Sequence, residues 1–168
     1  MAGHREALLE GAITCIREKG YARTTARDLV AASGTNLASI GYHYGSKDAL
    51  LRAAIFESFQ RWYMPLIEAI SERDLADVTR ELLTGLGEHR WLLVTHLEAV
   101  AEAQRNEELR EFIAARYGDF RGVLADRLGG GPEAEQQAAR IMALLDGTIL
   151  QYLLGVDWLE TDALLKAV

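Results

Sequence analysis

The residues best suited to chemistry in this 168-residue chain lie close together in one stretch, TNLASIGYHYGSK at 35–47. Tyr42, His43 and Lys47 all carry hydrogen-bond donors, and the lysine adds a positive charge. A packed core does not favour so many polar and aromatic groups in a row. The set is suited to binding an anionic surface, such as the phosphates of DNA.

Short helices on both sides of a turn are expected to position this stretch. Thr25 and Asp28 have the spacing of a capping box, which predicts the start of one helix, and Gly34 is expected to end it. Asn36 is expected to cap the next helix, over residues 37–44, because its side-chain oxygen can accept a hydrogen bond from a free amide.

Two short helices separated by such a turn form a helix-turn-helix, in which the start of the second helix meets base edges in the DNA major groove. The side chains of Ala38 and Ser39 are small enough to let the backbone approach the bases. The donors that follow them are placed to reach phosphates. A further helix, with Ser46 as its expected cap, presents an N-terminus that can itself bind a phosphate.

The composition and punctuation of the whole chain predict an all-α fold. Ala, Leu, Glu and Arg dominate, and no alternating run of Val, Ile and Thr is long enough for a strand. Pro65 is expected to end or kink the helix that starts near Lys47. Besides the short helix between the Thr25 cap and Gly34, the expected helices lie at about 4–19, 37–44, 47–62, 66–73, 75–86, 90–103, 107–128 and 133–155, with a short one from about 161.

The single cysteine, Cys15, excludes an intrachain disulfide and a cysteine-rich metal site, which suits a reducing compartment. It shares the apolar face of the first helix with Leu8, Ala12 and Ile16, and is expected to be a small buried hydrophobe. The N-terminus lacks the apolar region of a signal peptide, and no apolar run approaches the roughly 20 residues that span a membrane. We therefore expect a soluble, cytoplasmic protein.

The formal net charge of −7 argues at first against a nucleic-acid partner, but the charge is unevenly distributed. Residues 1–48 hold six Lys and Arg against five Asp and Glu, a net charge of +1. Residues 49–168 hold twelve against twenty, a net charge of −8. A near-neutral first part can therefore meet a polyanion while the acidic remainder stays away from it.

The segment GYARTTARDLVAASGTNLASIGYHYGSKDALL, Gly20 to Leu51, resembles the TetR family of transcriptional regulators. The resemblance lies in an ordered set: glycine, aromatic, Thr-Thr, Arg-Asp-Leu, Ser-Gly, a recognition helix, then an aromatic pair and G-S-K-D-x-L. ALLDGTILQYLLG, residues 143–155, is similar to the family's penultimate helix, which is used in dimerisation. The resemblance implies a DNA-binding domain at 1–48 and a helical ligand-binding and dimerisation domain at 49–168, joined by a shared fourth helix.

The resemblance also implies which residues meet DNA. At the second helix, Thr25 and Arg27 would touch the DNA backbone or a base. At the start of the third helix, the residues that would face bases are Asn36, Leu37, Ala38 and Ser39. The residues that would clamp phosphates are Tyr42, His43 and Lys47.

The chain departs from the family pattern at two positions. Gly41 stands where an aromatic residue is usual, which weakens the third helix by up to about 1 kcal/mol. Val30 replaces the usual small alanine, so the packing of the second helix on the third must adjust. The arm before His4 is very short, so no minor-groove contacts are expected from it.

Several of these residues also have structural alternatives. Tyr44 is expected to be a core aromatic rather than a DNA contact. His43 and Lys47 could be solvated, and Arg27 could pair with a nearby carboxylate.

A small-molecule effector would occupy a cavity enclosed by the helices from the fourth to the eighth. The residues expected to line it are Phe59, Trp62, Trp91, His96, Phe112 and Phe120. Each alone fits core packing better than a ligand contact. His96 lies near Glu98 and Glu102 at a spacing that can bind metal, but a solvated or dimer-facing cluster explains them better because no second ligand cluster appears. No cofactor is expected.

The helix at 133–155 and the short one after Asp157 would pack against their two-fold mates as a four-helix bundle. Gly147 would permit close approach of the helices. The expected interface residues are Ile141, Leu144, Leu145, Thr148, Ile149 and Tyr152.

The function implied is a homodimeric, ligand-responsive regulator, expected to be a repressor, that binds a near-palindromic operator with half-site centres about 34 Å apart. Activation stays open, since it depends on where the operator lies. A helical enzyme is the main rival class, but the sequence has no phosphate loop, nucleophile elbow or H-E-x-x-H pair. A helical module that has lost DNA affinity is the second rival, left open by Gly41 and Val30.

Overall fold

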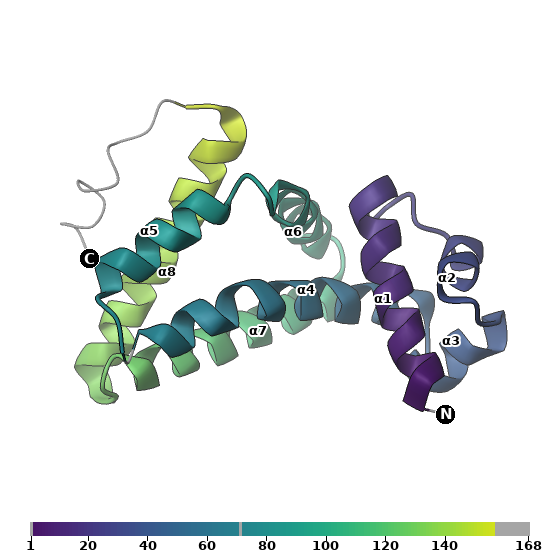
Figure 1. The fold of residues 1–168 in the computed structure, drawn as a ribbon, viewed down its shortest axis with the longest axis horizontal. Coiled ribbons are helices and arrows are strands. Elements are labelled where there is room, and N and C mark those ends of the chain that lie inside the picture. The colour runs from purple at the N-terminus through teal and green to yellow at the C-terminus, as the bar shows by residue number, and fades with distance from the viewer. Residues whose placement is uncertain (1, 71, 157–168) are drawn as a thin grey trace. The chain divides into compact units, whose positions relative to one another are not determined.

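The computed structural model describes residues 2–70 and 72–156, and within them the protein consists of α-helices and their connections, without strands (Figure 1). The predicted all-α fold is confirmed. The helices are α1 Ala2–Lys19, α2 Ala26–Ser33, α3 Leu37–Tyr44, α4 Lys47–Ala69, α5 Leu75–Gly85, α6 Arg90–Ala103, α7 Glu107–Arg127 and α8 Gly131–Leu154. The chain forms two compact units, residues 1–61 and residues 62 onward, and α4 passes from the first into the second.

Most helix positions agree with the sequence predictions, but the prediction around Pro65 is wrong in one respect. The fourth helix does not end there; α4 continues through Pro65 to Ala69, and the described residues of 66–73 form no separate helix. A proline inside a helix costs roughly 3 kcal/mol. Leu66 and Ile67, which follow directly, are buried, and burial of two such side chains offsets that cost at roughly 1.5–3 kcal/mol each. The short helix expected from about 161 lies outside the described residues.

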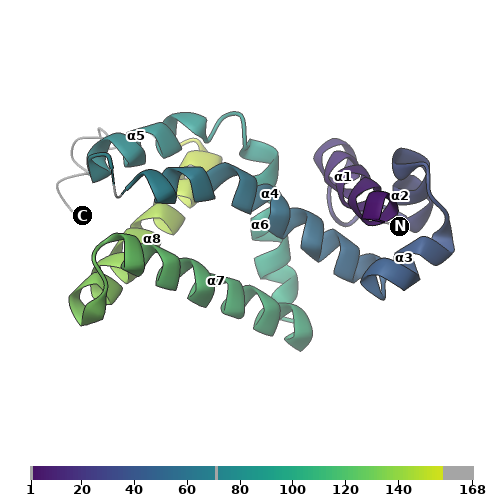
Figure 2. The same cartoon turned by 60° about the horizontal axis from the view of Figure 1, so that its bottom comes forward.

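The core of the first unit forms where α1 meets the two short helices that follow it (Figures 1 and 2). The predicted apolar face of α1 is buried, including Cys15, and burial raises the pKa of its thiol. Gly11 allows the close approach: a Cβ there would lie 3.0 Å from the backbone nitrogen of Ser33 at the end of α2. The other buried apolar residues of this unit are Leu29, Ile40, Leu50, Leu51 and Ala54.

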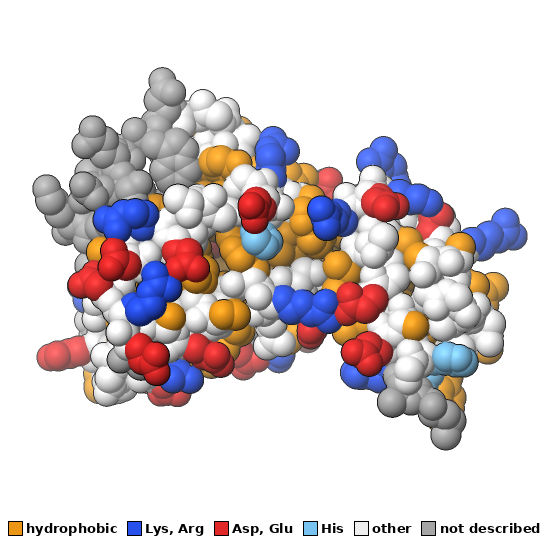
Figure 3. Space-filling view, in the orientation of Figure 1, with side chains coloured by type: hydrophobic (Ala, Val, Ile, Leu, Met, Phe, Trp, Pro, Cys, Tyr) orange, Lys and Arg blue, Asp and Glu red, His pale blue; other side chains and the backbone are white. Residues whose placement is uncertain are grey.

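The second unit packs the end of α4 against α7 and α8. Ile67, Leu124 and Ile141, one from each helix, are buried in a common cluster with Tyr63 and Phe120 packed against it. The Tyr63 and Phe120 rings lie 4.6 Å apart. On the visible face of this unit, acidic side chains are spread among basic ones (Figure 3), in keeping with the acidic composition of this part of the chain.

A small apolar cavity lies inside the second unit, with a volume of about 30 Å³. Ten residues line it: Leu66, Ile67, Ile70, Leu75, Val78, Thr79, Leu82, Phe120, Leu124 and Leu145. This volume holds about one or two water molecules, so a larger occupant requires the walls to move apart. Among the described residues, no helix combines the length and the apolar character needed to cross a membrane.

Candidate nucleic-acid interface

The two short helices of the first unit begin and end where the sequence predicts. Thr25 caps α2, and the capping box with Asp28 is present. Gly34 ends α2 in the left-handed conformation, with φ of 64°. Asn36 caps α3 by accepting a hydrogen bond from the Ser39 amide at 3.1 Å. A left-handed glycine followed at once by an N-cap is a compact turn, and it holds α3 at a fixed angle to α2.

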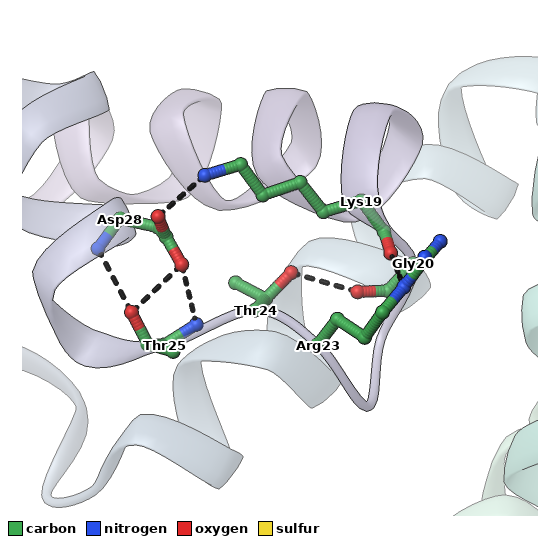
Figure 4. A network of polar contacts seen from close by, with 6 residues as sticks. All are labelled: Lys19, Gly20, Arg23, Thr24, Thr25 and Asp28. Carbon is green, nitrogen blue, oxygen red and sulfur yellow. Dashed lines mark hydrogen bonds and ion pairs between the residues drawn. The ribbon is translucent and has the colours of Figure 1, made fainter.

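A network of polar contacts holds the start of α2 (Figure 4). The Thr25 amide and hydroxyl both donate to Asp28 Oδ2, at 2.9 and 2.7 Å, and the Asp28 amide donates to the Thr25 hydroxyl oxygen at 3.2 Å. Lys19 of α1 pairs with the other carboxylate oxygen. The lysine contact and the Thr25 hydrogen bonds hold the pKa of the Asp28 carboxyl well below its usual range. The N-terminal end of α2 is therefore fastened to the C-terminal end of α1.

The face of α3 that points away from the core is accessible. Tyr42 is 75% exposed and Leu37 is 57% exposed, and Ala38 and Gly41 are also exposed. Ile40 lies on the other side of the helix and is buried. An exposed, capped helix after a tight turn has the arrangement needed to enter a DNA groove.

The predicted phosphate-binding residues surround the end of α3. The ring of His43 is half-buried, with an edge-to-face contact to the Tyr42 ring at 4.8 Å. Lys47 Nζ lies 3.4 Å from a carboxylate oxygen of Asp48 and 3.5 Å from the Thr24 carbonyl oxygen. The lysine is therefore held at the start of α4, where the Ser46 hydroxyl accepts from the Ala49 amide at 3.0 Å, as expected of the predicted cap.

Tyr44 and Arg27, beside this surface, differ in their surroundings. The Tyr44 hydroxyl donates to the Arg5 carbonyl at 2.9 Å, and the Arg5 guanidinium lies 5.4 Å from the tyrosine ring. These contacts tie α3 to α1, which agrees with the structural role expected for Tyr44. Arg27 is exposed on α2, and Asp28, next to it, pairs with Lys19 instead.

Two models of known protein families match this chain. Residues 8–54 match the model for bacterial regulatory proteins of the tetR family, and residues 71–168 match the tetracyclin repressor-like C-terminal domain. The chain belongs to the TetR family. The helices α2 and α3 thus lie in the part of this TetR-family chain that matches the first of these models.

Similar proteins support the same family. The chain is 32% identical over 120 residues to the HTH-type transcriptional repressor AcnR of Corynebacterium efficiens, covering 71% of this chain and 59% of that protein. It is 30% identical over 142 residues to the HTH-type transcriptional repressor Rv1474c of Mycobacterium tuberculosis, covering 84% and 71%. The match thus spans less than two thirds of the length of AcnR.

Solved structures show the same fold. The multidrug binding protein EbrR, in complex with proflavin, matches with a TM-score of 0.70 at 24% identity, over 98% of this chain and 99% of that one. A TetR transcription regulator from Haloarcula marismortui also matches with a TM-score of 0.70, at 20% identity, over 99% and 93%.

The residues predicted for an effector pocket of this TetR-family protein are spread over both units. Phe59 belongs to the first unit, and of the other five only Phe120 lines the apolar cavity. Trp62 stacks on His89, with ring centroids 4.3 Å apart and planes 6° apart. Trp91 is half-buried, and the Phe112 ring lies 5.7 Å from the Arg116 guanidinium. Their role in effector binding stays a prediction.

His96 takes part in a polar chain that the sequence did not reveal. Its Nε2 lies 3.1 Å from the Tyr117 hydroxyl, which donates to Asp146 Oδ1 at 3.1 Å, so the chain links α6, α7 and α8. Burial lowers the pKa of His96 and raises those of Tyr117 and Asp146, although the Tyr117 hydrogen bond partly opposes the shift at Asp146. Within residues 2–70 and 72–156, no group of three or more His, Cys, Asp or Glu side chains is arranged to hold a metal ion.

The residues predicted for a dimer interface all lie on α8. Ile141 and Thr148 are buried within the second unit itself, and Leu145 packs against its core cluster. Leu144, Ile149 and Tyr152 are half-buried. Leu150 and Leu154, further along the helix, are exposed. The interface stays a prediction, and the two exposed leucines are apolar surface that a partner could cover.

Proposed function

We propose that this chain is a cytoplasmic, ligand-responsive transcriptional repressor that binds a near-palindromic operator as a homodimer and is released by a small-molecule effector. The observation that carries the proposal is the exposed face of α3, presented by a fixed turn and followed by donors at Tyr42, His43 and Lys47. The relatives AcnR and Rv1474c, named as HTH-type transcriptional repressors, support the same reading.

The first unit would supply DNA affinity through phosphates and selectivity through bases. Arg27, Lys47 and the N-terminus of α4 would contact phosphates, with Thr25 fixed beside them by its hydrogen bonds to Asp28. The start of α3, Asn36 to Ser39, would face the bases. In a homodimer, two such helices would meet half-sites one helical turn apart, which requires a near-palindromic operator.

The second unit would bind the effector and transmit its presence along α4. Two consecutive residues of α4 are anchored differently: Arg61 pairs with Glu57 and with Glu10 of α1, whereas Trp62 stacks on His89. Movement of the Trp62–His89 stack would therefore shift the helix that also carries Arg61. An effector acts only through its different affinities for the two positions of α4. EbrR, crystallised with proflavin, is a TetR-fold precedent for a small-molecule complex.

A selection from a random duplex pool tests the DNA-binding part. The purified chain should enrich a near-palindrome with two half-sites one turn apart. Tyr42→Ala should fold normally, because this side chain is largely exposed, and should bind the enriched duplex more weakly. Leu97→Ala, which truncates an exposed leucine on α6, is the matched control and should bind normally. A pool without enrichment, or enrichment unaffected by Tyr42→Ala, would contradict the proposed surface.

The effector part is tested with the same duplex. Compounds that raise the melting temperature of the protein are added to the complex, and release of labelled DNA is recorded. Trp62→Ala should reduce release by an active compound far more than it reduces DNA affinity. An equal loss of both would argue against transmission through α4.

A further inference from the structure

The exposed face of α3 is apolar where it would meet base edges. Leu37, the first residue of the helix, and Ala38 are both exposed, and Gly41 lies one turn after Leu37 on the same face. A Cβ placed on Gly41 would have nothing within 4 Å in the described part of the chain. The first part of this face therefore consists of one large apolar side chain, one methyl group and bare backbone, and the exposed Tyr42 follows it.

The polar side chains nearby are already engaged in capping α3. Asn36 Oδ1 accepts from the Ser39 amide at 3.1 Å and from the Ser39 hydroxyl at 3.2 Å. These two bonds use both lone pairs of the oxygen. Reading adenine with two hydrogen bonds requires the same oxygen to accept from the base, so it would break the cap. The Ser39 hydroxyl, in turn, donates within the helix end rather than outward.

The Asn36 amide nitrogen can still donate to a base, but the exposed side chains of Leu37 and Ala38 offer only apolar contact, and one base offers an apolar group in the major groove. Thymine presents its 5-methyl group there. The other groups in the major groove are hydrogen-bond donors and acceptors, which all four bases carry. An exposed leucine and an alanine methyl can bury such a group, and the missing side chain at Gly41 allows the helix to approach it closely.

We propose that α3 selects its half-site mainly through the 5-methyl groups of thymine, which Leu37 and Ala38 contact in the major groove. This inference rests on the proposed function and adds the class of base that the helix selects. Leu37 is then the main specificity-determining residue. Asn36 and Ser39 act as positioning residues that hold the start of the helix.

The charges around this face favour DNA over an apolar protein partner. No acidic residue lies in the first turn of α3, and the N-terminal end of the helix carries the positive end of its dipole. His43 lies in the last turn of α3, and Lys47 follows at the start of α4. An apolar surface beside a helix N-terminus and the Lys47 ammonium, which also pairs with Asp48, suits a groove whose floor carries methyl groups and whose walls carry phosphates.

Deoxyuridine tests the inference without altering the protein, because it is thymidine without the 5-methyl group. The duplex enriched from the random pool is resynthesised with dU in place of dT at matching positions of both half-sites, one pair of positions at a time. Affinity of the wild-type chain should fall roughly tenfold at the positions that face Leu37, as expected for two buried methyl groups. Replacing dC by 5-methyl-dC elsewhere in the half-site reports whether a methyl group alone attracts the helix.

Leu37→Ala identifies the residue that reads the methyl group. This variant should bind the dT duplex more weakly and should lose its sensitivity to dU at those positions, whereas Leu97→Ala should keep the full tenfold difference. Equal binding of dT and dU duplexes by the wild-type chain would overturn methyl reading but leave the proposed function intact. A pool without any enriched duplex would overturn both, and binding of α3 to a protein partner would then explain the apolar face.

Discussion

Replacing Gly41 with alanine should stabilise the protein. Gly41 lies inside α3, has an ordinary negative φ, and would present its new Cβ to open space. Alanine in place of an exposed helical glycine gains roughly 0.5–1 kcal/mol, because the unfolded chain loses less entropy on folding. A change of 1 kcal/mol moves the melting temperature of a chain of this size by about 2–4 °C. We therefore expect Gly41→Ala to raise it by about 1–4 °C.

Gly34→Ala is the matched comparison. Its Cβ would also meet nothing within 4 Å, but its φ is 64°, in the left-handed region. Alanine there costs roughly 1–2 kcal/mol, so the melting temperature should fall by a few degrees. Thermal unfolding followed by far-ultraviolet circular dichroism measures both variants. Two shifts of the same sign would refute the assignment of Gly41 to a helix and Gly34 to the turn.

Three further predictions concern the second unit. Gly85→Ala should disturb the stacking of Trp62, because a Cβ would lie 3.2 Å from the indole nitrogen, and tryptophan fluorescence should report the change. Tyr117→Phe should destabilise the protein by roughly 0.5–1.5 kcal/mol in a chemical denaturation experiment, because it removes the hydrogen bond to the exposed Asp146 carboxylate. His96→Gln should reduce the loss of stability between pH 7.5 and 5.5, measured as melting temperature.

The sign of the pH effect follows from burial. The pKa of His96 is lowered in the folded protein, so the unfolded chain, with a histidine pKa of about 6.5, binds the proton first as the pH falls. The contribution of His96 to the free energy of unfolding is thus fully present above about pH 6.5 and is lost as the pH falls below that value. The raised pKa of Asp146 acts in the opposite direction, because the folded protein then binds that proton more readily than the unfolded chain. An unchanged pH profile in the glutamine variant would contradict a buried, neutral His96.

Local signals in the sequence were sufficient to predict the helix-turn-helix. Thr25, Gly34 and Asn36 act on residues within three or four positions, and each caps or ends its helix as the spacing predicts. The contact of Lys19 with Asp28 spans nine residues across a turn, and no local spacing rule indicates it. The family resemblance, carried by the same short segment, was likewise sufficient to identify the TetR family.

Features of the second unit depend on contacts between distant segments and were predicted less well. The helix continues past Pro65 because Leu66 and Ile67 are buried by other helices, which the proline itself does not reveal. The chain from His96 to Asp146 joins residues from three helices. Aromatic side chains along a helix are compatible both with core packing and with a pocket, so the sequence alone could not distinguish them.

The salt dependence of DNA binding tests the central claim most directly. Arg27 and Lys47 from two protomers would neutralise about four phosphates, so the logarithm of the affinity for the enriched duplex should fall with the logarithm of the salt concentration with a slope near −4. Lys47→Gln, which removes one phosphate contact from each protomer, should change this slope from near −4 to near −2. A slope near zero, or one unchanged in this variant, would contradict a first unit that binds DNA through these residues.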